Sequence, residues 1–88
     1  MTTLEKNVKN LIIEGLELDI DPEEINKDTP LFDVEYGLGL DSLEALEIVT
    51  ILSNEYGVNF DGVEREVFTS VATLSKYIEE QLKVEETS

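Results

Sequence analysis

The stretch Gly39-Leu-Asp-Ser-Leu-Glu-Ala-Leu-Glu47 places a serine directly after an aspartate, at a point where a helix is expected to begin. Asp41 is a favourable N-cap residue, and the acid three places later completes a pair typical of a capping box. Apolar residues then recur at helical spacing as far as Tyr56, and Gly57 follows as a stop signal. The stretch therefore predicts a helix from Asp41 to about Tyr56, with Ser42 in its first turn.

The segments on either side of this helix also predict helices, and no segment shows the alternation of a strand. Residues 3–15 form one apolar helical face after a Thr2–Glu5 capping pattern, and a last helix is expected from about residue 69. A short third helix is expected after Asp61. In the long connection over residues 16–40, a short helical turn is expected after Asp21. Its candidate core anchors are Ile20, Ile25, Leu31 and Phe32. We therefore predict a small all-α bundle.

Composition limits the possible partners. The chain has 88 residues, 21 acids, 6 bases and neither histidine nor cysteine, which gives a net charge of −15. Nucleic acid and anionic lipid surfaces should repel it, whereas basic protein surfaces should attract it. No signal peptide or membrane-spanning run is visible, so we expect a soluble cytoplasmic monomer. We place one domain over residues 1–83 and expect a disordered tail over residues 84–88.

The predicted second helix has an apolar face on both sides. At about 100° per residue, its core side would carry Ala45, Ile48, Val49, Leu52 and Tyr56. The opposite side would carry Leu43 and Leu46, framed by Asp41, Glu44 and Glu47, with Ile51 at its flank. Nine acids and no lysine or arginine lie between residues 28 and 64. This outer side is either a docking surface for basic partners or a solvated acidic face that keeps the protein soluble.

Ser42 lacks the surroundings of a catalytic nucleophile. A serine hydrolase needs a general base, usually histidine, and the chain has none. No calcium-binding loop fits the sequence, because Glu24 and Pro30 stand where an EF-hand starting at Asp19 would need glycine and glutamate. We therefore expect neither an enzyme nor a metal site. A remaining role is modification by another protein, since an anion on Ser42 would lie at the positive end of the helix dipole; otherwise Ser42 is only a tolerated first-turn residue.

The residues 38–43, Leu-Gly-Leu-Asp-Ser-Leu, resemble the attachment motif of acyl carrier proteins, Leu-Gly-x-Asp-Ser-Leu. The resemblance extends over most of the chain. It includes Glu47 and Tyr56 on the second helix, the turn at residues 23–25, Phe32 in the long connection and the Phe-Thr-Ser-Val run at residues 68–71. It implies a four-helix bundle of the acyl-carrier type, with a long first loop and a short third helix.

The resemblance also implies a function. Ser42, with Asp41 beside it, would receive 4′-phosphopantetheine from coenzyme A through a phosphopantetheinyl transferase, and the arm would carry acyl groups as thioesters in fatty acid, lipid or polyketide-type biosynthesis. Loading ligases or acyltransferases and ketosynthase-type enzymes would dock through basic patches. Their binding surface would comprise Asp41, Leu43, Glu44, Leu46, Glu47 and Ile51. The acyl pocket would comprise Ala45, Ile48, Val49, Leu52, Tyr56, Val71, Leu74 and Ile78.

Several positions depart from the common fatty acid pattern. About two extra residues lie between Phe32 and Leu38, and Gly37 stands where an acid is usual. Ser53 and Asn54 occupy places that are often acidic, and no proline opens the third helix. These differences favour a specialised, discrete carrier. Two other readings stay open at this point, a peptidyl or aminoacyl carrier of nonribosomal synthesis and an unmodified acidic protein-interaction module.

Overall fold

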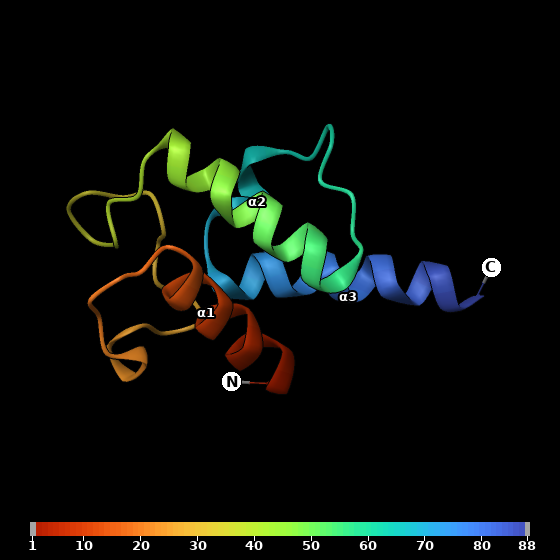
Figure 1. Ribbon diagram of the computed structural model, residues 1–88, viewed down its shortest axis with the longest axis horizontal. Helices are drawn as coiled ribbons and strands as arrows, with labels where there is room; N and C mark the ends of the chain where they lie inside the picture. Colours follow the sequence, from red (N-terminus) through yellow and green to blue (C-terminus); the bar gives the residue numbers. More distant parts are fainter. Residues whose placement is uncertain (1, 88) are drawn as a thin grey trace.

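A computed structural model describes residues 2–87 of the protein, with the side chains of residues 65 and 83–87 left aside. Three α-helices occur in this part of the chain, α1 (Thr3–Gly15), α2 (Ser42–Tyr56) and α3 (Val71–Thr87). Two 3-10 turns, η1 (Pro22–Glu24) and η2 (Arg65–Phe68), lie in the connections, and residues 2–87 contain no strand. The all-α prediction is confirmed (Figure 1).

Local capping explains where the first two helices begin. The hydroxyl of Thr2 accepts from the N–H of Glu5 at 3.1 Å, and the Glu5 carboxylate accepts from the N–H of Thr2 at 2.7 Å. Asp41 and Glu44 form the same reciprocal pair at the start of α2. Each pair satisfies two backbone donors that a helix leaves unpaired at its start. The predicted starts of both helices are therefore confirmed.

The segment predicted to form a short third helix is a 3-10 turn. Residues 61–62 form a turn in which Gly62 adopts the left-handed φ of 73°. Helical structure starts only at η2, which spans four residues and has no side-chain cap from Glu64. So short a segment cannot repay the cost of nucleating an α-helix. Within residues 2–87 the bundle therefore contains three α-helices, with η2 in the place of the predicted short third helix.

The long connection between α1 and α2 is anchored in the core. Ile25 and Leu31 are almost completely buried, and Ile20 and Phe32 pack against the core with part of their surface exposed. Backbone bonds tie the connection to the C-terminal part of the chain, from the N–H of Leu31 to the carbonyl of Thr69 and from Ala72 to Lys27, both 2.9 Å long. These contacts explain how a small domain holds so long a loop.

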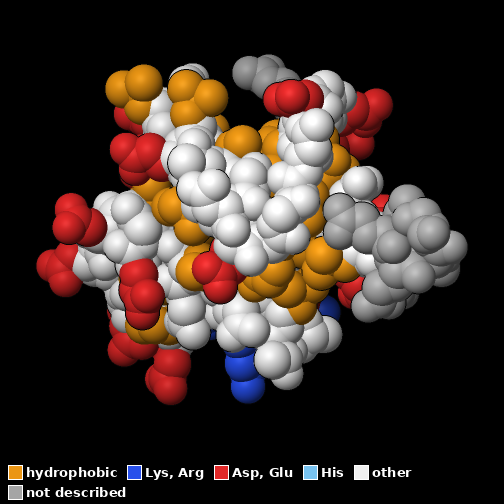
Figure 2. Space-filling model, turned by 45° about the vertical axis from the view of Figure 1, so that its right-hand side comes forward, with side chains coloured by type: hydrophobic (Ala, Val, Ile, Leu, Met, Phe, Trp, Pro, Cys, Tyr) orange, Lys and Arg blue, Asp and Glu red, His pale blue; other side chains and the backbone are white. Residues whose placement is uncertain are grey.

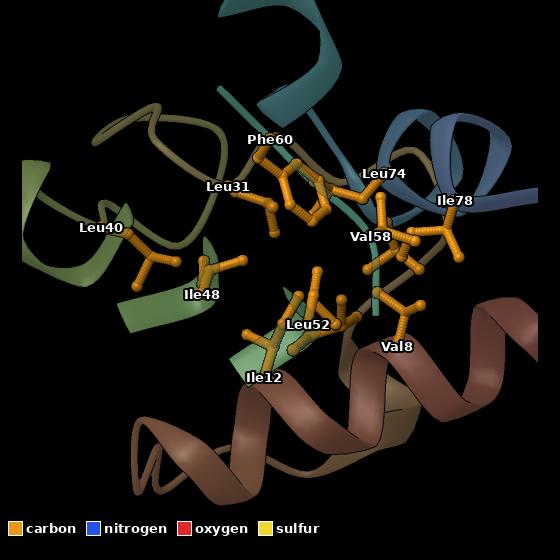
Figure 3. Close-up of a cluster of buried hydrophobic side chains, with 12 residues drawn as sticks. Val8, Ile12, Leu31, Leu40, Ile48, Leu52, Val58, Phe60, Leu74 and Ile78 are labelled. Atoms are coloured by element: carbon orange, nitrogen blue, oxygen red, sulfur yellow. The ribbon is translucent and has the colours of Figure 1, made fainter. Parts of the chain in front are cut away.

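One hydrophobic core joins the helices to their connections. The helix α1 packs against both α2 and α3. In Figure 3 side chains from all three helices and from the loops point toward one another. Those that are fully buried include Val8, Ile12, Leu31, Ile48, Leu52, Leu74 and Ile78. The start of α2 lies at one end of this core, beside the α1–α2 connection (Figure 1).

A disordered tail is predicted at residues 84–88. The side chains of these residues, and residue 88 as a whole, lie outside the part that the structure describes. The helix α3 runs to Thr87. The division into a domain and a tail therefore stays a prediction. Among residues 2–87, no helix combines the length and the apolar composition that crossing a bilayer requires.

The Glu5 carboxylate in the cap of α1 should make the free energy of unfolding depend on pH. The backbone N–H of Thr2 is the main cause that lowers the pKa of Glu5 below its ordinary value of 4.5, against a smaller opposing effect of burial. A lowered pKa means that the ionised carboxylate stabilises the folded state. This stabilisation is complete above pH 4.5 and is lost as the pH falls through the lower, folded-state pKa.

Glu5→Gln should therefore lower the free energy of unfolding at pH 7 by about 0.5 kcal/mol, since glutamine keeps an acceptor for Thr2 but removes the charge at the start of the helix. The difference between wild type and variant should vanish as the pH falls well below 4.5. Urea unfolding at a series of pH values measures it. Comparing the two proteins at each pH cancels the general relief of repulsion among the other acids. A difference that is independent of pH would contradict this account.

Candidate functional site

Ser42 is the first residue of α2 and is exposed to solvent. The N-cap residue Asp41 is extended, and its carboxylate accepts from the N–H of Glu44 at 2.9 Å. The Glu44 carboxylate accepts in turn from the N–H of Asp41 at 3.3 Å. These bonds fix the start of the helix, so the position of Ser42 on its first turn is set by the residues around it.

The backbone before Ser42 is also anchored. Leu40 is buried, and its N–H donates to the carbonyl of Leu31 at 3.0 Å. Gly39 adopts a left-handed φ of 66°, a conformation that side chains other than glycine rarely tolerate. The chain thus leaves the core at Leu40 and enters α2 within two residues. An anion bonded to the Ser42 oxygen would lie at the positive end of α2, where the helix dipole favours it.

A cavity of about 830 Å³ opens beside Ser42. Its walls come from the α1–α2 connection, from the first half of α2 and from the end of η2. The residues lining it are Pro30, Phe32, Asp33, Leu40, Asp41, Ser42, Ala45, Leu46, Val49, Phe68 and Thr69. Behind Phe68, the rings of Phe60 and Tyr77 continue an aromatic cluster with centroid separations of 5.9 and 5.1 Å. The exposed serine therefore adjoins a largely apolar space.

The predicted acyl-pocket residues divide between this cavity and the core. Ala45 and Val49 line the cavity. The others do not, because they lie in or against the closed core, namely Ile48, Leu52, Tyr56, Val71, Leu74 and Ile78. Sequence periodicity separates the buried side of a helix from its exposed side, but it does not tell a packed interior from the edge of a cavity. Phe32, Leu40 and Phe68 were therefore missed as lining residues.

The outer side of α2 has the exposure expected of a docking surface. Leu43 is 71% exposed and Leu46 is 64% exposed. Asp41 and Glu47 are exposed around them, and Glu44 is half-buried. Leu46 also lines the cavity, so the docking surface and the cavity share an edge. The structure thus brings the predicted partner-binding residues at the start of α2 together around Ser42.

Ile51 has a different position from these residues. It is half-buried, and a side chain at Gly15 would collide with it, so the end of α1 packs closely against this part of α2. Ile51 and Gly15 line a second, shallower groove of about 360 Å³ together with Leu46, Glu47 and Thr50. The structure therefore places Ile51 in the contact between helices, at the margin of the exposed surface.

The surface around α2 is strongly acidic. No lysine or arginine occurs between residues 28 and 64, which contain nine acids. On the face of the molecule in Figure 2, acidic side chains are widespread and lysine or arginine is scarce. Across the part of the chain with described side chains, no group of three or more Asp and Glu residues is arranged to hold a metal ion. The excess of acids creates a negative field, which attracts positively charged surfaces.

The part of the chain that the structure describes contains helices and no strand, and it presents an exposed serine at the start of an acidic helix, beside an apolar cavity. Residues 8–78 match the family model described as the phosphopantetheine attachment site, which spans most of the chain. The protein belongs to this phosphopantetheine-binding family. Members of the family carry 4′-phosphopantetheine bound covalently to a serine, so the protein is a phosphopantetheine carrier. Such carriers interact with phosphopantetheinyl transferases and with acyl-processing enzymes.

Proposed function

We propose that Ser42 is the attachment serine and that the protein is an acyl carrier without an enzymatic activity of its own. The observation that carries this proposal is the exposed position of Ser42 on the first turn of α2, inside the region that matches the family. Buried serines are poor substrates for a modifying enzyme, and Ser70 and Ser75 are both almost completely buried. Ser42 also lies in the Asp-Ser-Leu context of the attachment motif.

The chain supplies the acceptor oxygen for attachment. The Ser42 oxygen attacks the pantetheine-bearing phosphorus of coenzyme A, the bond from this phosphorus to the adenosine-bearing phosphate breaks, and adenosine bisphosphate leaves. In this proposal the serine proton passes to a base of the transferase. The start of α2 then favours the new phosphodiester charge. When bound, phosphopantetheine supplies the thiol that holds acyl groups and that this cysteine-free chain lacks.

The cavity supports acyl cargo over aminoacyl cargo. Its walls include Phe32, Val49 and Phe68, which favour burial of a hydrocarbon chain. The charged amino group of an aminoacyl cargo would gain nothing from burial against these apolar walls. The exposed leucines and the acidic residues around Ser42 then serve visiting enzymes, which need electrostatic steering for fast association and a small apolar contact for quick release.

We further propose that the carrier serves a dedicated pathway of fatty acid, lipid or polyketide-type biosynthesis. Two features support this. The loop at residues 33–37 is about two residues longer than in the common fatty acid pattern, and Ser53 and Asn54 on α2 stand in place of acids. Partners adapted to a more acidic helix should bind this surface less well, because each missing charge weakens the attraction.

The test uses the phosphopantetheinylated protein and records the intact mass after incubation with three loading systems. A fatty acid ligase with a fatty acid should add an acyl group, whereas an amino-acid-adenylating enzyme should add nothing. A housekeeping fatty acid ligase or malonyl transferase should load this protein at least about tenfold more slowly than the same enzyme loads a fatty acid synthase carrier. This ratio of rates corresponds to about 1.4 kcal/mol. Efficient loading by both housekeeping enzymes would refute the dedicated role, and aminoacyl loading alone would make the protein a peptidyl carrier.

A further inference from the structure

The loop at residues 33–37 is a hydrogen-bonded projection. The Asp33 carboxylate accepts from the N–H groups of Glu35 and Tyr36 at 2.8 and 3.0 Å. The Asp33 carbonyl accepts from the N–H groups of Gly37 and Gly39 at 3.0 and 3.1 Å. A side chain at position 37 would collide with the carbonyl of Pro30, so the turn closes only with glycine there. The loop therefore has a specific conformation that its own residues define.

This projection holds two large hydrophobic side chains in solvent. Val34 is 87% exposed and Tyr36 is 75% exposed, more than either Leu43 or Leu46 on α2. Among the side chains that the structure describes, these four are the large hydrophobic ones that are exposed. A single exposed apolar residue is ordinary, but a group of them around one site indicates a binding surface.

The base of the projection and the start of α2 lie close together. Asp33, at the base of the projection, lines the same cavity as Ser42. The backbone of Val34 lies against Gly39, where an added methyl group would be 3.6 Å from the Val34 Cα. Gly39 precedes Ser42 by three residues, and Leu43 follows Ser42 directly. The projection therefore lies beside the start of α2, where Ser42 is exposed.

We propose that Val34 and Tyr36 form a docking element for the phosphopantetheinyl transferase that modifies Ser42, an inference that rests on the proposed function. The transferase must bring coenzyme A to the Ser42 oxygen itself, so its surface has to cover the residues beside that oxygen. Enzymes that act at the far end of the flexible arm also dock on α2, but they need not reach the Ser42 oxygen itself. The element therefore fits a transferase whose active-site entrance has an apolar recess for Tyr36 and Val34.

The acidic residues beside the projection predict a positively charged rim around the recess of the transferase. Glu35 lies between Val34 and Tyr36 and is exposed, and Asp41 is exposed beside Ser42. No basic residue between 28 and 64 offsets these charges. A recess surrounded by lysine or arginine on the transferase would therefore meet an apolar projection surrounded by carboxylates. Transferases without a basic rim or without the recess should modify this chain poorly.

The experiment measures KM and kcat for the carrier with coenzyme A and a purified broad-specificity phosphopantetheinyl transferase, with intact mass as the readout. The double variant Val34→Ser, Tyr36→Ser should raise the KM by about tenfold and leave kcat unchanged, because it removes apolar contact in the encounter and leaves Ser42 in place. Tyr36→Ser alone should give a smaller rise. The matched control Val34→Ile, Tyr36→Phe keeps the apolar surface and should keep the wild-type KM.

Both altered side chains are exposed, so the melting temperatures of all variants should match that of the wild type. An unchanged KM in the double variant overturns the inference while leaving the proposed function intact, because the wild type is still modified. Absence of any mass gain in the wild type would instead reject the proposed function. If the double variant kept the wild-type KM but was loaded with acyl groups more slowly, the loop would be assigned to a later enzyme. If the wild type were a dimer that Tyr36→Ser separates, the loop would be assigned to a second copy. Both results overturn the transferase assignment.

Discussion

Ser42→Ala is expected to abolish the mass gain that we predict for the wild type with coenzyme A and a phosphopantetheinyl transferase. In the proposed reaction the hydroxyl oxygen of Ser42 forms the phosphodiester, so the variant has no acceptor at that position. The loss should be complete within the detection limit of intact-mass spectrometry. No other effect is expected on the fold, because Ser42 is exposed and the cap of α2 comes from Asp41 and Glu44.

The matched control is Ser53→Ala, which makes the same substitution near the other end of α2. This variant should gain one phosphopantetheinyl group, as the wild type does. The free energy of unfolding of both variants should stay within about 0.5 kcal/mol of the wild type, because Ser42 is exposed and the half-buried Ser53 loses only its hydroxyl. A mass gain that persists in Ser42→Ala would move the attachment site elsewhere, and no mass gain in the wild type with several transferases would reject a carrier role.

Leu52→Ala and Ile48→Ala are each expected to lower the free energy of unfolding by about 2–4 kcal/mol. Both side chains have no exposed surface and lie in the core between the helices (Figure 3). Truncation removes their transfer free energy from water and leaves a cavity that close packing fills only in part. Because small domains are stable by about 5–15 kcal/mol at most, either loss should appear as a large shift of the urea midpoint.

Leu43→Ala on the opposite side of α2 serves as the comparison. Its side chain is 71% exposed, so its removal should change the free energy of unfolding by less than about 0.5 kcal/mol. The same variant should weaken turnover by partner enzymes, since Leu43 adjoins Ser42 on the docking surface. Equal losses of stability in Leu43→Ala and Leu52→Ala would show that the burial assigned to the two sides of α2 is wrong.

The helix starts could be predicted because their causes are local. A capping box needs only residues that are three positions apart, and both Thr2–Glu5 and Asp41–Glu44 form the reciprocal bonds that their spacing predicts. Gly57 ends α2 in the left-handed conformation for an equally local reason. The exposed position of Ser42 follows directly from the cap that precedes it.

The segment after Asp61 does not form the helix that its local pattern predicts. An acid followed by spaced valines there resembles the start of a helix, but Gly62 bends the backbone and η2 begins only at residue 65. The turn is held from outside by Thr73, whose hydroxyl donates to the carbonyl of Val67 at 2.7 Å. That contact belongs to the start of α3 and is absent from the local pattern.

The order of the residues by itself determined the helices that have local caps, the two sides of α2, the acidic field and the placement of a solvent-facing serine. Each depends on neighbours within a turn or two of helix. Only the tertiary structure decided that a cavity adjoins Ser42 and that Val34 and Tyr36 project beside it. Both features arise where segments around residues 31, 40 and 69 are held together by backbone bonds, and the space left between distant segments depends on how they pack, which helical periodicity does not encode.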